Sequence, residues 1–153
     1  MIRLLFLLLW PVAASGQTPW VDQPFISACY ANAPAGQTAP PCLRQAADAC
    51  QTAPGNGTTH GIAGCLQAET SVWDALLNAA YQAKMSTLAL QEPHLPDQLR
   101  AAQRAWIAFR DAECDLNYEL WGGGSMRSIA AADCLLAETA ERALELRDLG
   151  KME

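Results

Sequence analysis

The chain has 153 residues, 51% of them hydrophobic, and its 16 acidic and 10 basic side chains give a net charge of −6. This length suits one domain with a modest hydrophobic core. The sequence carries no basic stripe and no nucleic-acid-binding motif, so nucleic acids are excluded as expected partners. An acidic surface instead favours basic partners through long-range attraction.

The first residues predict a cleavable secretory signal peptide at residues 1–16. Arg3 is followed by an apolar run from Leu4 to Ala14, and this run is shorter than the ~20 residues of a membrane-spanning helix. We expect cleavage after Gly16, with cleavage after Ala14 as the alternative. No cysteine follows that could accept a lipid, so we expect a periplasmic or secreted product without a membrane anchor after cleavage.

Six cysteines in an exported chain predict a disulfide framework. A metal site is disfavoured because the sequence has no Cys-x-x-Cys pair, and its two histidines, His60 and His94, lie in turn-like segments. We therefore expect no metal and no other cofactor. The cysteines are Cys29, Cys42, Cys50, Cys65, Cys114 and Cys134.

Residues 17–64 are expected to form an N-terminal extension with two short helices. The first helix is predicted at residues 25–33, before a Pro- and Gly-containing break, and the second at residues 42–50, after paired prolines. Residues 52–64 are rich in Gly, Thr and Pro and predict a loop.

Residues 65–149 are expected to form a helical domain of three long helices. The first runs from Cys65 to about residue 88. The second begins near Asp97 as N-cap, and the third follows Ser125 as its cap. The apolar stripe of the second helix is expected to face the core, and it comprises Leu99, Ala102, Trp106, Phe109, Leu116 and Leu120. The fold class is therefore all-α, an antiparallel bundle of three long helices with a disulfide-pinned N-terminal extension.

One disulfide follows from the bundle itself. Cys114 lies late in the second long helix and Cys134 lies early in the third. Antiparallel neighbours bring these positions face to face, so we expect a Cys114–Cys134 bridge behind the glycine-rich connection.

The other four cysteines allow two sets of pairs. On one helix, Cys42 and Cys50 would lie roughly 12 Å apart, beyond the roughly 7 Å that a disulfide allows. We therefore expect Cys50–Cys65 and Cys29–Cys42. The alternative set, Cys29–Cys65 with Cys42–Cys50, requires that residues 42–50 are not helical.

Polar side chains on the inner faces of the long helices are candidates for a network or a recognition site. A half-buried Arg110 needs a carboxylate, which we expect from Asp74 or Glu69. We interpret the network mainly as a device that fixes helix register, with a recognition site at a bundle end as the alternative. The stripes comprise Asp74, Asn78 and Tyr81 on the first helix, Gln103, Trp106 and Arg110 on the second, and Thr139 and Arg142 on the third.

The sequence predicts no enzyme and no catalytic residue. It has no nucleophile elbow, and its histidines lie in flexible segments. Two carboxylates could flank a sugar bond as in a glycosidase, but acidic residues on amphipathic helices are usually solvated or paired. The carboxylates considered are Glu69, Asp74, Asp111, Glu113 and Asp115.

Three stretches carry a family resemblance: Cys65-Leu66-Gln67-Ala68-Glu69, Trp73-Asp74-Ala75-Leu76-Leu77-Asn78-Ala79-Ala80-Tyr81 and Gln103-Arg104-Ala105-Trp106-Ile107-Ala108-Phe109-Arg110-Asp111-Ala112-Glu113-Cys114. With them, the chain resembles the lysozyme-inhibitor LprI-like N-terminal domain family of bacteria. The resemblance implies a helical, exported domain, and the family is named for a lipoprotein that inhibits lysozyme. The motif positions that carry over are Glu69, Asp74, Asn78, Tyr81, Gln103, Trp106, Arg110, Cys114, Ser125, Cys134 and Arg142, which resemble fold-defining positions more than an inhibitory site.

Two functions are therefore expected as alternatives. The first is inhibition of a basic lysozyme, which the net charge would complement, since loss of Arg3 with the signal peptide makes it −7. The candidate binding loop is Trp121-Gly122-Gly123-Gly124-Ser125, for which a plain connector between helices is the competing interpretation. The second function is that of a structural or accessory envelope protein that binds another envelope protein and does not inhibit lysozyme.

Overall fold

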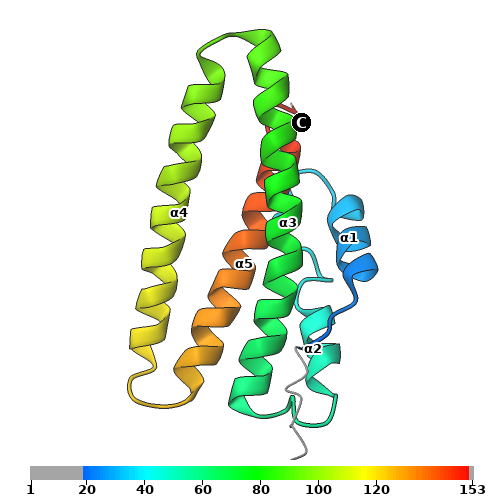
Figure 1. The fold of residues 1–153 in the computed structure, drawn as a ribbon, viewed down its shortest axis with the longest axis vertical. Coiled ribbons are helices and arrows are strands. Elements are labelled where there is room, and N and C mark those ends of the chain that lie inside the picture. The colour runs from blue at the N-terminus through cyan, green and yellow to red at the C-terminus, as the bar shows by residue number, and fades with distance from the viewer. Residues whose placement is uncertain (1–18, 152–153) are drawn as a thin grey trace, which may run out of the picture.

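The computed structural model describes residues 19–151, and the predicted signal peptide at residues 1–16 lies outside them. Within the described residues the fold is all-helical, without strands, which confirms the predicted fold class. Three long helices run up, down and up, and two short helices pack beside them (Figure 1). The helices are α1 (Gln23–Asn32), α2 (Gln45–Gln51), α3 (Thr59–Gln91), α4 (Leu95–Leu120) and α5 (Met126–Asp148).

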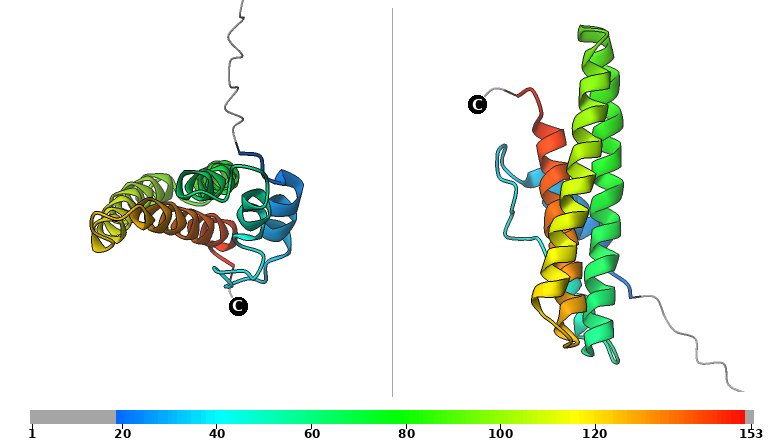
Figure 2. Two further views of the ribbon diagram at one scale, coloured as in Figure 1. Left: turned by 90° about the horizontal axis from the view of Figure 1, so that it is seen from below. Right: turned by 90° about the vertical axis from the view of Figure 1, so that its left-hand side faces the viewer.

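Helix α5 lies between the other elements. It packs along α3 on one side and along α4 on the other, whereas α4 approaches α3 mainly where the two helices join. Seen along the bundle, α1 and α2 lie at the opposite end of the molecule from α4 (Figure 2). None of the helices in residues 19–151 combines the length and apolar character of a membrane span.

The hydrophobic core joins the extension to the bundle. Ile26 of α1 and Ala47 of α2 are buried in the same cluster as Trp73 of α3 and Leu146 of α5. The ring of Tyr30 meets Trp73 edge to face, with 6.1 Å between ring centroids. Helix α3 also runs without interruption across residues 64–65, where the extension was expected to end.

Helix α3 starts earlier than the sequence predicts, so the expected loop at residues 52–64 ends at Thr58. The Thr58 hydroxyl accepts a hydrogen bond from the Gly61 N–H at 3.1 Å and caps the helix. A Cβ at Gly61 would lie 2.5 Å from the backbone of Asn56. The glycine that argued for a loop is therefore needed for close packing of the loop on the first turn.

Helix α4 also begins earlier than expected. Its N-cap is His94 and its first residue is Leu95, so the prediction that Asp97 is the N-cap is wrong. Pro96 lies within the first turn, where the missing N–H costs nothing. Asp97 instead forms an ion pair with Arg100 on the next turn.

The prediction that the apolar stripe of α4 faces the core is wrong for most of its members. Phe109, Leu116 and Leu120 are 56%, 52% and 74% exposed, and Ala102 is exposed too. The buried residues of α4 are instead Leu99, Gln103 and Cys114, with Trp106 partly buried. The helix contacts the bundle through a mixed polar and aromatic face, and this leaves the apolar face to solvent.

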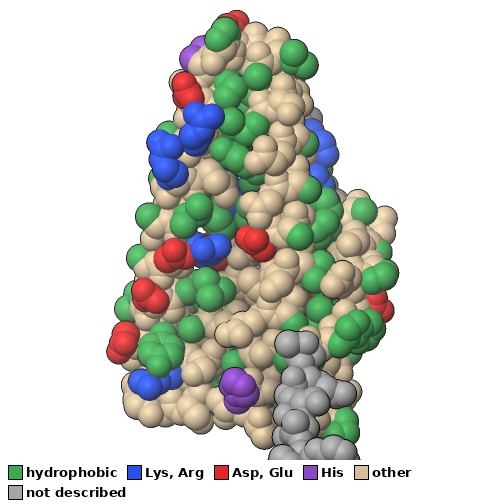
Figure 3. Space-filling view, in the orientation of Figure 1, with side chains coloured by type: hydrophobic (Ala, Val, Ile, Leu, Met, Phe, Trp, Pro, Cys, Tyr) green, Lys and Arg blue, Asp and Glu red, His purple; other side chains and the backbone are tan. Residues whose placement is uncertain are grey.

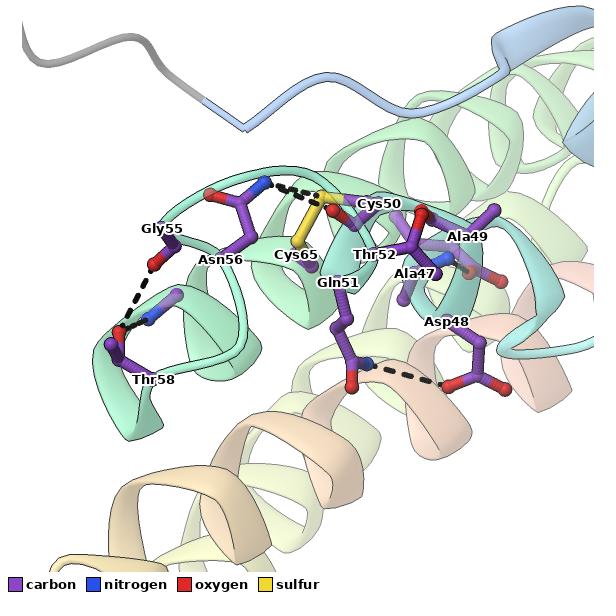
Figure 4. Close-up of a disulfide and its surroundings, with 12 residues drawn as sticks. Ala47, Asp48, Ala49, Cys50, Gln51, Thr52, Gly55, Asn56, Thr58 and Cys65 are labelled. Carbon is purple, nitrogen blue, oxygen red and sulfur yellow. Dashed lines mark hydrogen bonds between the residues drawn. A yellow bond between two sulfur atoms is a disulfide. The ribbon is translucent and has the colours of Figure 1, made fainter.

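The structure pairs the cysteines in the favoured arrangement, Cys29–Cys42, Cys50–Cys65 and Cys114–Cys134, with Cα–Cα distances of 5.9, 5.8 and 5.5 Å. Figure 4 shows the Cys50–Cys65 bridge between α2 and α3. The Asn56 side-chain amide donates to the Cys50 carbonyl at 3.0 Å and holds the intervening loop against the bridge. The prediction of a helix at residues 42–50 is wrong in its first turn, because α2 begins at Gln45 after Arg44, which adopts a left-handed φ of +75°. The alternative set with Cys42–Cys50 is excluded by the observed pairs themselves.

The C-terminal end of α5 holds α1 in place. The Arg147 guanidinium donates to the Tyr30 carbonyl and lies over the Tyr30 ring at 5.4 Å. The same guanidinium pairs with Asp148 at 2.6 Å, and this hydrogen bond, aided by Lys151, holds the pKa of Asp148 well below its usual range. Helix α1 is thus joined to the C-terminal end of α5 through the guanidinium of Arg147.

One buried hydroxyl in α5 offers a test of packing. Thr139 is 1% exposed, and its Oγ1 is the buried side-chain polar atom that has no hydrogen-bond partner in the described residues. A buried hydroxyl without a partner costs free energy. We therefore expect Thr139→Val to raise the free energy of unfolding by about 1 kcal/mol in urea denaturation.

The matched control is Thr70→Val. The Thr70 hydroxyl donates to the Leu66 carbonyl at 2.8 Å, so the same change should bring no gain there. Equal effects of the two substitutions would show that the missing partner of Thr139 has no energetic consequence.

Candidate functional site

The connection between α4 and α5 is a short, exposed loop. Gly122 adopts a φ of +60°, in the left-handed region that favours glycine, and its N–H donates to the Glu119 carbonyl at 2.9 Å. Trp121, immediately before it, is 53% exposed. The Cys114–Cys134 bridge joins the two helices behind the loop and fixes their separation.

Ser125 stands at the N-cap position of α5, but its side chain makes no capping hydrogen bond. Its hydroxyl instead lies 3.4 Å from the Thr59 hydroxyl on the first turn of α3. The disulfide therefore joins the helices that flank the loop, and the α5 end of the loop also contacts α3.

A groove beside this loop is acidic. It lies between the last turns of α4 and the first half of α5, and Trp121 and Met126 lie at its loop end. Asp133 is neutralised by Arg44, but Glu113 and Glu138 have no ion-pair partner among the described residues. The lining comprises Glu113, Asn117, Trp121, Met126, Ile129, Ala130, Asp133, Cys134, Ala137 and Glu138.

The pKa of Glu138 reflects the charge of the groove. Its pKa is raised above the usual value, first by burial and then by the neighbouring carboxylates Glu141, Glu113 and Glu145, while Arg110 opposes the change. Negative charge therefore exceeds positive charge around this side chain. Such a surface attracts cationic groups of a partner.

Above the groove, the structure brings the predicted residues of α4 and α5 together. The Arg142 Nε donates to the Gln103 Oε1 at 3.0 Å, and its Nη1 pairs with Glu145 at 2.9 Å. Two guanidinium groups lie over the Trp106 ring, that of Arg110 at 5.0 Å and that of Arg142 at 5.9 Å from the ring centroid. This cluster fixes α4 on α5, because Arg142 of α5 contacts both Gln103 and Trp106 of α4.

The prediction that Arg110 pairs with Asp74 or Glu69 is wrong. Arg110 pairs with its neighbour Asp111, whose Oδ1 accepts from Nε at 2.9 Å and from Nη2 at 2.7 Å. Asp74 is exposed on α3 and accepts from the Asn78 side-chain amide at 2.9 Å. The adjacent carboxylate of Asp111 reaches the guanidinium that lies over Trp106, so no partner from α3 is needed. Tyr81, the third residue of that predicted stripe, packs at the edge of the core.

Glu69 has a different role from the one expected. It is 1% exposed, and its carboxylate accepts from the Arg44 N–H at 3.0 Å, the Ala47 N–H at 2.7 Å and the Trp73 indole N–H at 3.3 Å. Two of these donors are at the N-terminus of α2, so Glu69 caps that helix from α3. The motif residue therefore attaches the extension to the bundle.

Arg44 is a residue beside the groove that the sequence analysis missed. Its backbone adopts a φ of +75°, which is rare for a residue with a side chain, and its guanidinium forms a bidentate pair with Asp133, one contact being 2.7 Å. The two residues are 89 positions apart in the chain, so no local sequence pattern predicts that they pair. Arg44 links the extension directly to the acidic groove.

Neither histidine lines this groove. His60 is exposed on the first turn of α3, and His94 is exposed at the N-cap of α4. Within residues 19–151, no group of three or more His, Cys, Asp or Glu side chains is arranged to hold a metal ion.

A family model, lysozyme inhibitor LprI, matches residues 50–146. The chain belongs to the LprI family. The match includes Glu69, the α4–α5 cluster and the glycine loop, and it begins at Cys50 rather than at residue 65. No solved structure matches the chain.

Two bacterial relatives of this LprI-family protein are similar in sequence. An uncharacterized protein, R02472, of Rhizobium meliloti is 32% identical over 95 residues, which cover 56% of this chain and 68% of the relative. An uncharacterized 17.7 kDa protein in the puhA 5′ region of Rhodobacter capsulatus is 30% identical and aligns over 98% of this chain and 96% of its own length. The second alignment includes the N-terminal extension, so the extension and the LprI-type bundle occur together in that relative as well.

Proposed function

We propose that this protein is an exported lysozyme-binding domain that inhibits a basic lysozyme through the glycine loop and the acidic groove beside it. The family supports an inhibitor rather than an enzyme, and three disulfides are typical of proteins outside the cytoplasm. We propose a periplasmic or secreted location. The observation that carries the proposal is the acidic groove with an exposed tryptophan at its loop end.

The geometry supports two kinds of contact in this complex. Trp121 offers a large apolar surface on a short loop between two disulfide-joined helices, so less conformational freedom is lost on binding than for a free loop. Glu113 and Glu138 offer carboxylates that the described residues leave without ion-pair partners. Together they suit a partner with basic side chains around a concave site, as a basic lysozyme provides.

A cell-wall clearance assay tests inhibition. The chain from residue 17, with its disulfides formed, is titrated against a basic lysozyme at low salt. We expect inhibition at micromolar excess, and weaker inhibition as salt rises, because the attraction is electrostatic. Full lysozyme activity at micromolar excess and low salt would contradict the proposal.

A structural or accessory role in the envelope is the second candidate. The observation that favours it is that Glu69, Gln103, Trp106 and Arg142 all act within the fold. This role predicts a stable protein with no lysozyme affinity. Pulldown from an envelope extract would then identify the partner.

A further inference from the structure

Residues 56 and 57 form an Asn-Gly pair in the loop between α2 and α3. Asparagine is chemically labile, because the backbone nitrogen of the next residue can attack its side-chain amide. A glycine in that next position has no Cβ to hinder the attack. The other three asparagines of the chain, Asn32, Asn78 and Asn117, lie in helices and precede alanine or tyrosine.

The fold holds the two reacting groups of this pair differently. Gly57 is exposed, and its N–H makes no hydrogen bond in the described residues. The Asn56 side chain is half-buried, and its amide donates to the Cys50 carbonyl at 3.0 Å and lies 3.6 Å from the Cys50 Sγ (Figure 4). In the closed loop the attacking nitrogen is therefore unengaged, whereas the side chain that it must reach is fixed on Cys50.

We propose that Asn56 is a site of spontaneous deamidation, which the closed loop suppresses and which prevents the loop from closing again once it has occurred. The Gly57 nitrogen loses its proton and bonds to the Asn56 Cγ, and the bond from Cγ to Nδ2 breaks with release of ammonia. Water then opens the succinimide ring at either carbonyl and leaves aspartate or isoaspartate at position 56. The sum of the steps is amide plus water giving acid plus ammonia, and nothing is oxidised or reduced.

Opening of the loop sets the rate of this reaction in the folded chain. The attack requires the Asn56 side chain to leave Cys50, so it proceeds from the minority of molecules in which the loop is open. The Cys50–Cys65 bridge joins the two helices that flank the loop and limits this opening. The folded chain should therefore deamidate more slowly than the unfolded chain.

Neither product fits the place that Asn56 occupies. An aspartate has no N–H to donate and would turn carboxylate oxygens toward the Cys50 carbonyl. Isoaspartate adds a methylene to the main chain, at a point where even a Cβ on Gly61 would lie 2.5 Å from the Asn56 backbone. Among the described residues, the hollow beside Asn56 is lined by Asp22 and by no lysine or arginine that could pair with the new charge. Figure 3 likewise shows no lysine or arginine among the coloured side chains over the lower half of α3, which begins at this loop.

Peptide mapping by mass spectrometry tests the site. The chain from residue 17 is incubated in mildly alkaline buffer, either folded or in guanidinium chloride, and the mass change from amide to acid is followed at each asparagine. In guanidinium chloride we expect Asn56 to convert at least about tenfold faster than the other three, because only Asn56 precedes a glycine. Conversion of Asn56 no faster than that of Asn78 in the unfolded chain would overturn the proposal.

The same measurement tests suppression by the fold. We expect Asn56 to convert at least about tenfold more slowly in the folded chain than in guanidinium chloride, since the loop is then open in only a small fraction of molecules. Equal rates in the two states would overturn the claim that the closed loop protects Asn56.

Gly57→Ala is the matched control for the chemistry. A Cβ at this position would meet nothing closer than the Gln51 carbonyl oxygen at 4.0 Å, so the closed loop can accept it. The added methyl group hinders attack by the nitrogen, so the variant should lose most of the conversion of Asn56 in guanidinium chloride. Unchanged conversion would show that the nitrogen of residue 57 is not the nucleophile and would overturn the mechanism.

Asn56→Asp tests the consequence, because it introduces one of the two products directly. We expect amide hydrogen exchange over residues 52–61 to increase at least about tenfold in this variant. Asn32→Asp, at an exposed position at the end of α1, makes the same chemical change elsewhere and should leave exchange over residues 52–61 unchanged. Exchange in Asn56→Asp equal to that of the unchanged chain would overturn the claim that the modified loop cannot close.

Discussion

Glu69→Gln is expected to lower the free energy of unfolding by about 3 kcal/mol. The carboxylate is buried and accepts three N–H donors, two of them from the N-terminus of α2. A glutamine of the same size would turn an NH₂ group toward one of these donors and leave it without an acceptor. Urea denaturation followed by circular dichroism measures the change.

The loss should be concentrated in the extension. Because Glu69 holds Arg44 and Ala47, amide hydrogen exchange should increase most in α2 and its flanking loop. Glu92→Gln is the matched control, since Glu92 is exposed and its side chain makes no hydrogen bond in the described structure. An effect of Glu69→Gln no larger than that of the control would contradict the capping role.

Removal of the Cys114–Cys134 bridge is the second change with a large expected effect. Replacing both cysteines with alanine should lower the free energy of unfolding by about 3 kcal/mol, because the bridge closes a long loop. The sequence separation is 20 residues, and the loop it closes includes Trp121 and the glycines. Thermal unfolding without reductant measures the stability change.

The same variant should also bind lysozyme about tenfold more weakly. Without the bridge the free loop is less ordered, and ordering it on binding costs free energy. The matched control replaces Cys29 and Cys42 with alanine, which removes a bridge of sequence separation 13 in the extension. The control should lose comparable stability but keep its lysozyme affinity. Equal losses of affinity in both variants would show that the Cys114–Cys134 bridge has no specific effect on lysozyme binding.

The elements with local signals were predictable from the sequence. Paired prolines, glycines and periodic apolar residues located the helices approximately. The helix predicted at residues 42–50 favoured Cys29–Cys42 and Cys50–Cys65, and both pairs are present although α2 begins only at Gln45. Helix starts at Thr59 and Leu95 were missed, because Gly61 and Pro96 serve close packing and the first helical turn there.

Contacts between distant residues were not predictable. The Arg44–Asp133 pair and the capping of α2 by Glu69 depend on how the extension folds back on α3 and α5. The inner face of α4 was mistaken for the same reason. Periodicity identified an apolar stripe on that helix, but it does not tell which face of the helix packs on the bundle.

The candidate site was half predictable. The glycine loop and the Cys114–Cys134 bridge follow from the sequence, and the structure places them together at one end of the bundle. The acidic groove does not follow, because Glu113 and Glu138 lie on different helices and meet only through the α4–α5 register.

Calorimetric titration of a basic lysozyme with the chain from residue 17 tests the proposed function most directly. We expect saturable binding at low salt, about thirtyfold weaker for Trp121→Ala, as for a central interface residue, and also weakened by the double substitution E113Q/E138Q. Leu90→Ala, on an exposed residue far from the loop, should bind as the unchanged chain does. Absence of binding, or binding that none of the groove and loop substitutions alters, would contradict the account.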